Sequence, residues 1–196
     1  MKTLIKEAAE KMKELGAKVN EVSLMDPKYA IGVYTIVQRS EVSSNLARYD
    51  GIRYGNSREV FNEENKRRIM LGTYVLSSGY YEAYYKKAQQ VRTVIVKEFE
   101  KVFADYDLLI GPVSPGPALK MGASKDQPMF GEIEDRLVEA SSIAGLPGVS
   151  VPCGFVDGLP IGLQITGKQF EEEKVMSAAK SYQENTDYQK FPKLDE

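Results

Sequence analysis

Three consecutive basic residues could bind an anionic group: Lys66, Arg67 and Arg68. An arginine guanidinium donates two parallel hydrogen bonds to a carboxylate, a geometry that lysine cannot match. Three basic residues on a helix more often form a solvated face. The residue types alone therefore allow either a carboxylate clamp or an exposed helix surface.

Two further clusters allow a similar choice. An acidic cluster could hold paired carboxylates for acid–base catalysis, or could be the first turn of a helix, where acidic side chains complement the helix dipole: Glu132, Glu134, Asp135 and Glu139. A tyrosine cluster could stack nucleic acid bases. Because no basic groove accompanies it, we expect a helix-packing surface instead: Tyr80, Tyr81, Tyr84 and Tyr85.

The chain contains no histidine and one cysteine, Cys153. These two counts exclude Ser-His-Asp and Cys-His catalysis, histidine-ligated zinc, cysteine-cluster metal sites and intrachain disulfides. Serine pairs occur, but none lies in the glycine-rich turn that usually supplies an oxyanion hole: Ser43-Ser44, Ser77-Ser78 and Ser141-Ser142. Phosphate-binding and dinucleotide-binding glycine motifs are also absent. The residues alone do not identify a reaction.

The size and charge of the chain fit one globular domain, which we place at residues 1–196. The 26 basic and 28 acidic residues give a net charge of -2, so no overall basic field favours nucleic acid. The sequence shows neither a signal-peptide apolar region nor a membrane-spanning apolar run. With a single free thiol, these features favour a soluble protein in the reducing cytoplasm.

Hydrophobic periodicity and turn residues predict an α/β fold, a mixed β-sheet layered with helices. Gly16 and Gly145 each follow a helix as expected C-terminal caps, and Asp157-Gly158 predicts a hairpin turn. We expect helices at 1–15, 27–49, 62–77, 81–106, 133–144 and 171–185. We expect strands at 17–24, 108–110, 149–151 and 161–165, the strand at 108–110 being buried on both faces. Irregular loops are expected at 51–60 and 112–128.

Five blocks of sequence resemble the amidase signature family, and within it the A subunits of tRNA-dependent amidotransferases, which act on glutamyl-tRNA(Gln) or aspartyl-tRNA(Asn). Together they extend over essentially the whole chain in the family's order and spacing. The blocks are Ser40–Gly55, Lys66–Thr73, Ser77–Tyr85, Ala144–Gly154 and Gly158–Gln164.

The resemblance implies a partial amidase-signature fold, the C-terminal part of such a protein. The family's catalytic lysine and two serines lie in an N-terminal Gly/Ser-rich signature that has no match here, so we expect no catalytic residue and no activity from this chain alone. The family's glutamine pocket maps to Arg68 for the α-carboxylate, Asp135 for the α-ammonium and Tyr34 nearby. Glu134 is an alternative to Asp135, because the local pattern at 132–136 departs from the family's. The segment 56–65 is also shorter than the family's usual connection.

The function that the resemblance implies belongs to a complex. Glutamine is hydrolysed to ammonia, which amidates a misacylated tRNA on a partner B subunit that uses ATP and Mg, and a small C subunit binds alongside. No cofactor or metal is expected in this chain. The alternatives are part of a general amidase and a non-catalytic stand-alone binding or interaction domain. An exposed sheet edge would also make self-association possible.

Overall fold

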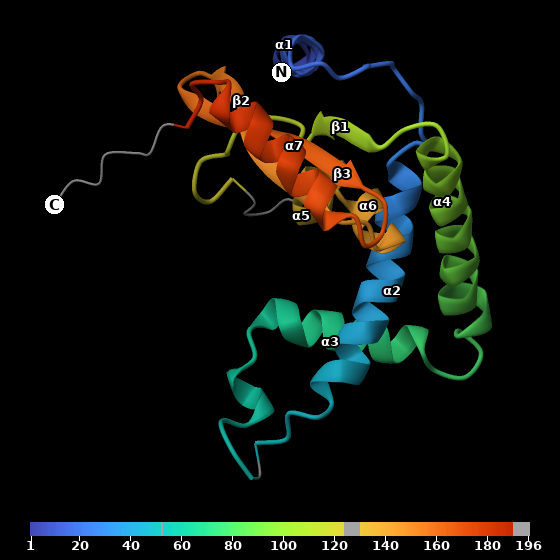
Figure 1. The fold of residues 1–196 in the computed structure, drawn as a ribbon. Helices are drawn as coiled ribbons and strands as arrows, with labels where there is room; N and C mark the ends of the chain where they lie inside the picture. The colour runs from blue at the N-terminus through green and yellow to red at the C-terminus, as the bar shows by residue number, and fades with distance from the viewer. Residues whose placement is uncertain (52, 124–129, 190–196) are drawn as a thin grey trace, which may run out of the picture.

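The computed structural model describes residues 1–51, 53–123 and 130–189. Helices and short strands follow one another along the chain (Figure 1). In chain order they are α1 (Lys2–Glu14), α2 (Lys28–Leu46), η1 (Arg58–Val60), α3 (Glu63–Val75), η2 (Glu82–Lys86), α4 (Lys87–Phe103), β1 (Leu108–Pro112), α5 (Phe130–Asp135), α6 (Glu139–Ala144), β2 (Gly148–Val156), β3 (Leu159–Gly167) and α7 (Glu172–Glu184).

Strands β1, β3 and β2 form an antiparallel sheet in that order. The β2–β3 hairpin turns at Asp157 and Gly158, which have φ angles of 51° and 79°. A two-residue turn with positive φ at both positions has a backbone twist that fits the right-handed twist of the flanking strands. Asp-Gly is favoured in such turns because both residues tolerate a positive φ. The hairpin expected from these two residues is confirmed.

The sheet lies between two hydrophobic clusters. On one face, α1 and α7 cover the alternating buried residues of β3, Ile161, Leu163 and Ile165. On the other face, Leu109 of β1 packs against the cluster formed by α2, α4 and α6, whereas its neighbour Leu108 packs against the first cluster. This two-sided layering confirms the expected α/β class.

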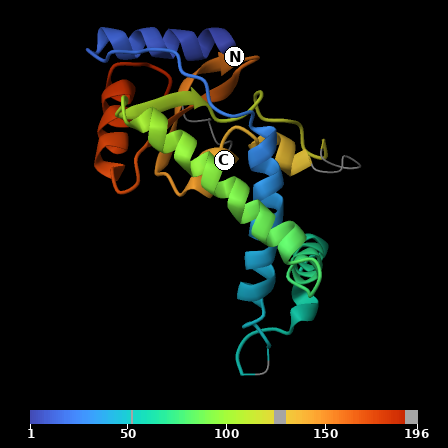
Figure 2. The same cartoon turned by 90° about the vertical axis from the view of Figure 1, so that its right-hand side faces the viewer.

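Helix α3 lies outside this layered body and packs on α2, away from the sheet (Figures 1 and 2). The two helices approach closely at Gly72, where an added Cβ would overlap the carbonyl of Arg39 and lie 2.7 Å from the Cβ of Ser43. Beside it, the hydroxyls of Ser43 and Thr73 form a 2.7 Å hydrogen bond. The crossing point therefore fixes which face of α3 meets α2.

Several expected elements differ in the structure. Residues 17–24 form no strand: Val19 packs against the first hydrophobic cluster, but no described strand pairs with this segment. The helix expected over 133–144 is divided into α5 and α6 by a turn at 136–138. The helix expected over 81–106 begins with the π-helical turn η2 and ends at Phe103.

Other expectations hold in part. Strand β1 forms where it was expected, but its residues are half-buried rather than buried on both faces, since β1 is an edge strand. The expected loop at 51–60 contains the short helix η1. The expected loop at 112–128 is irregular at 113–123, and residues 124–128 lie outside the described residues. The expected caps are confirmed: Gly16 and Gly145 have positive φ angles of 95° and 70°.

Candidate functional site

Arg68 lies on α3 and faces Tyr34 of α2. Its Nε donates a 2.6 Å hydrogen bond to Oε1 of Glu64, one helical turn earlier, and its Nη1 donates a longer one of 3.4 Å to the Tyr34 hydroxyl. The Arg68 side chain is 26% exposed, so it is sheltered but reachable from solvent. Of the three pocket residues expected from the sequence, the structure brings Arg68 and Tyr34 together.

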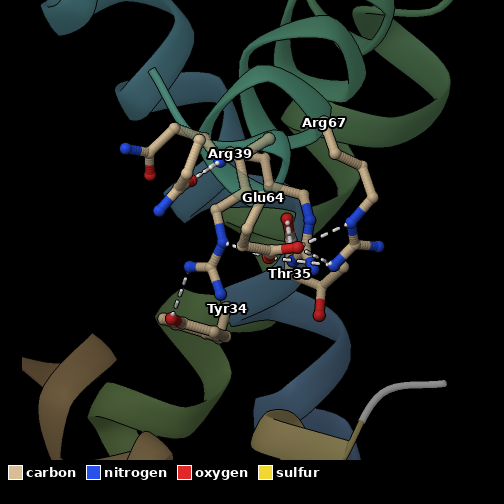
Figure 3. A network of polar contacts seen from close by, with 8 residues as sticks. Tyr34, Thr35, Arg39, Glu64 and Arg67 are labelled. Atoms are coloured by element: carbon tan, nitrogen blue, oxygen red, sulfur yellow. Dashed lines mark hydrogen bonds and ion pairs between the residues drawn. The ribbon is translucent and has the colours of Figure 1, made fainter. Parts of the chain in front are cut away.

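Glu64 connects the two arginines of the basic run. Its carboxylate accepts hydrogen bonds of 2.8 and 2.9 Å from Arg67, in addition to the bond from Arg68. Figure 3 shows Glu64 directed toward Arg67, with Tyr34 at the opposite side of the network. Burial alone would raise the pKa of Glu64, but the hydrogen bonds from Arg68 and Arg67 outweigh it and lower that pKa. The carboxylate is therefore held in its charged form.

The rest of the basic run is solvated. Lys66 pairs with Glu63 at 3.4 Å, and the Glu63 side chain is 94% exposed. Arg67 is half exposed, whereas Arg68 alone turns toward α2. The solvated-face interpretation thus applies to Lys66 and Arg67, whereas the clamp of a ligand carboxylate by Arg68 stays a prediction.

The start of α3 is fixed by its own sequence. The Asn62 side chain accepts a 2.8 Å hydrogen bond from the Asn65 backbone amide, which caps the helix. Glu63 and Glu64 occupy the first turn, where negative charge complements the helix dipole. Once the helix has started here, Glu64 lies one turn before Arg68. Side chains separated by four residues in a helix are neighbours, so the sequence spacing already indicated that these two could pair.

An open pocket of about 560 Å³ lies between α2 and α3, next to Arg68. Most of its lining residues are polar, and they include two carboxylates and one guanidinium. The lining residues are Gln38, Glu41, Val42, Asn45 and Leu46 of α2 and Glu64, Asn65 and Arg68 of α3. The lining therefore offers hydrogen-bond donors and acceptors to a ligand.

Asp135, the third expected pocket residue, ends α5 and is exposed, and its neighbour Glu134 is half-buried. Among the hydrogen bonds and ion pairs of the described residues, none joins either carboxylate to Arg68 or Tyr34. The adjacent Arg136 is close enough to Asp26 to contribute to the lowered pKa of that carboxyl, although the hydrogen bonds from Lys28 are the main cause. The role of Asp135 or Glu134 stays a prediction.

The tyrosine cluster is mostly exposed rather than the helix-packing surface expected, and of its four members Tyr85 is half-buried. Tyr80, Tyr81 and Tyr84 are exposed. The rings contact one another instead: the ring centre of Tyr80 lies 4.2 Å from that of Tyr74 and 6.0 Å from that of Tyr84. Because the rings pair among themselves, they need no buried partner.

Serines of two of the three pairs bond to nearby backbone carbonyls. The Ser141 and Ser142 hydroxyls donate to the carbonyl of Val138, and Ser77 donates to that of Tyr74. Within the described ranges, no group of three or more acidic or cysteine side chains could hold a metal ion. Over the same ranges, no helix combines the length and apolar character needed to cross a bilayer.

The layered fold agrees with comparisons to known proteins. The amidase family model matches residues 1–176, so the chain belongs to the amidase family. Among curated relatives, the A subunit of glutamyl-tRNA(Gln) amidotransferase from Streptococcus uberis is 51% identical, over 97% of this chain and 42% of that protein. Its counterpart from Exiguobacterium sibiricum is 49% identical, over 99% of this chain and 43% of that protein.

A solved structure gives the same result. The A subunit of glutamyl-tRNA(Gln) amidotransferase from Thermotoga maritima superposes with a TM-score of 0.74 at 38% identity, covering 96% of this chain and 39% of that one. The chain thus spans about two fifths of the length of the relatives it matches, and the resemblance found in the sequence is confirmed.

Proposed function

We propose that this chain is the C-terminal part of the glutaminase component, the A subunit, of a tRNA-dependent amidotransferase, and that it supplies the carboxylate-binding side of the glutamine pocket. The observation that carries the proposal is the contact of Arg68 with Tyr34 between α3 and α2. The similarity to the A subunits of glutamyl-tRNA(Gln) amidotransferases supports the choice of glutamine as ligand.

The chemistry of the proposed pocket follows from its groups. The guanidinium of Arg68 donates two hydrogen bonds to the α-carboxylate of glutamine, and the Tyr34 hydroxyl adds a polar contact beside it. Asp135, or Glu134 in its place, balances the α-ammonium with a negative charge. Both carboxylates lie on α5, whereas Arg68 lies on α3. A glutamine that contacts Arg68 and one of these carboxylates must therefore extend from α3 toward α5.

The reaction itself requires residues outside this chain. We propose that the remainder of the protein supplies the lysine and serines that hydrolyse glutamine to glutamate and ammonia. The ammonia then amidates glutamyl-tRNA(Gln) on a B subunit that uses ATP and Mg, with a C subunit bound alongside, in the cytoplasm. The outer edges of β1 and β2 pair with no described strand, which supports further pairing there with the rest of the protein or with a second copy.

A second candidate function is a binding domain without catalysis. It is favoured by the pocket between α2 and α3, which is formed entirely by residues of this chain. Glutamine binding without hydrolysis by the protein in its natural assembly would support this alternative.

The test is a titration of the purified chain with L-glutamine, followed by NMR, together with an assay for ammonia release. Arg68→Lys keeps the positive charge but removes the two parallel donors of the guanidinium. We expect this substitution to cost about 1.5–3 kcal/mol of binding free energy, which raises the Kd for L-glutamine roughly 10- to 100-fold. Arg48→Lys is the matched control, because Arg48 is exposed just after α2 and contacts the Tyr49 ring. Equal affinities of the two variants would refute the role of Arg68, and ammonia release by this chain alone would refute the absence of a nucleophile.

A further inference from the structure

The hydrogen bonds of Arg68 divide its guanidinium into an occupied edge and an available one. Glu64 accepts from Nε at 2.6 Å, which occupies the side of the fork nearest the helix. The Nη1 nitrogen reaches the Tyr34 hydroxyl at 3.4 Å. Among the described residues, Nη2 has no hydrogen-bond partner. The outer edge, formed by Nη1 and Nη2, therefore remains available for a ligand carboxylate.

Glu64 is itself held from a second side. Arg67 donates from both Nε and Nη2, at 2.8 and 2.9 Å, in the fork geometry that fixes a carboxylate plane. Glu64 thus shares its negative charge between two guanidinium groups. The cluster of Glu64, Arg67 and Arg68 keeps one net positive charge, and the free edge of Arg68 presents it on the side of Tyr34.

Two opposite effects of Glu64 on an anionic ligand are possible. As a competitor, its carboxylate would satisfy Arg68 and weaken the binding of a second carboxylate. As a support, it would fix the rotamer of a long side chain and reduce the entropy lost on binding. Two observations favour support: Arg67 compensates the charge of Glu64, and Glu64 bonds only Nε, which leaves Nη2 and the second hydrogen of Nη1 for the ligand.

We propose that Glu64 is a positioning residue for glutamine: it holds Arg68 through Nε so that the Nη1–Nη2 edge meets the α-carboxylate beside Tyr34. This inference rests on the proposed function, since it requires Arg68 to bind that carboxylate. Glu64 acts through Arg68 and does not itself touch the ligand.

The test compares Glu64→Gln with Glu63→Gln in the full chain. Glu63 is the adjacent carboxylate of the same helix turn, but among the residues that the structure describes it pairs only with Lys66, and its side chain is 94% exposed. Its variant therefore controls for charge and helix stability. We expect Glu64→Gln to raise the Kd for L-glutamine roughly fivefold or more, and Glu63→Gln to leave it within about twofold. Thermal unfolding of both variants checks that they are folded.

Two further measurements separate positioning from a structural role. L-glutamine amide lacks the α-carboxylate, so Glu64→Gln should not change its affinity. In a double-mutant cycle, Glu64→Gln should add little to the loss caused by Arg68→Lys, because both act through one contact.

Each outcome decides between the claims. Unchanged affinity in Glu64→Gln, or tighter binding as a competitor would give, overturns the positioning role while Arg68→Lys still tests the proposed function. If neither Glu64→Gln nor Arg68→Lys changes the affinity for L-glutamine, or if the wild-type chain does not bind glutamine, both the positioning role of Glu64 and the assignment of the pocket to Arg68 fail.

Discussion

The close approach of α3 to α2 at Gly72 places Arg68 against α2, and Gly72→Ala tests this. The new methyl group would overlap the Arg39 carbonyl and approach the Ser43 Cβ to 2.7 Å. Overpacking of this kind costs about 1–3 kcal/mol. If α3 moves away to relieve it, the 2.7 Å hydrogen bond between Ser43 and Thr73 is also lost, at about 1 kcal/mol.

The higher helix propensity of alanine opposes this destabilisation, but its effect is small and can be measured separately. Alanine is favoured over glycine inside a helix by about 0.5–1 kcal/mol. Gly32→Ala is the matched control, because Gly32 lies in α2, the other helix of this crossing, and an added Cβ there meets nothing within 4 Å. The control should stabilise the protein, whereas Gly72→Ala should destabilise it by about 1–3 kcal/mol net.

The assay is equilibrium unfolding in urea, supported by thermal unfolding. A net loss of this size lowers the Tm by roughly 2–10 °C for a chain of this length. A Gly72→Ala variant as stable as Gly32→Ala would show that the two helices do not cross as closely as described, and would refute the reasoning that fixes Arg68 against Tyr34.

Three other predictions concern separate parts of the molecule. Burial raises the pKa of the Cys153 thiol, so a thiol reagent at neutral pH should label the native protein slowly and the urea-unfolded protein quickly; equal rates would contradict the buried position. Gly158 has a φ of 79° with open space around it, so Gly158→Ala should cost about 1–2 kcal/mol from backbone strain alone, and an unchanged free energy of unfolding would contradict the turn. Because the folded-state pKa of Glu64 lies below its ordinary value of 4.5, its stabilisation is present above that value and is lost as pH falls through the lowered pKa. The difference in stability between wild type and Glu64→Gln should therefore shrink toward acid pH, and a constant difference would exclude the ionised Glu64 as its source.

Local signals in the sequence predicted those elements that local chemistry determines. The Asp157-Gly158 turn and the glycine caps at Gly16 and Gly145 depend on backbone conformations that few residues adopt, so residue type alone identifies them. The amphipathic helix α1 follows in the same way from its apolar stripe.

Elements that depend on distant contacts were less predictable. Residues 17–24 have strand-like valines, but a strand requires a neighbour, and no described strand is adjacent to them. The exposure of the tyrosine cluster also depends on a tertiary feature, the contact of Tyr80 from the turn after α3 with Tyr74. Spacing cannot reveal which rings will meet across a turn.

The site was predictable to a similar extent. Arg68 and Tyr34 came from the family resemblance, and their contact depends on the α2–α3 crossing, which no local pattern encodes. Glu64 was missed although its i to i+4 spacing to Arg68 is visible in the sequence, because such pairs are common on solvated helices and carry little information by themselves.

The most direct test of the central claim is a crystal structure of the chain with L-glutamine. We expect the α-carboxylate on the Nη1–Nη2 edge of Arg68, within hydrogen-bond distance of the Tyr34 hydroxyl, with Nε still bound to Glu64. Glutamine bound elsewhere on the chain, with Arg68 unchanged and without ligand, would contradict the assignment of this pocket.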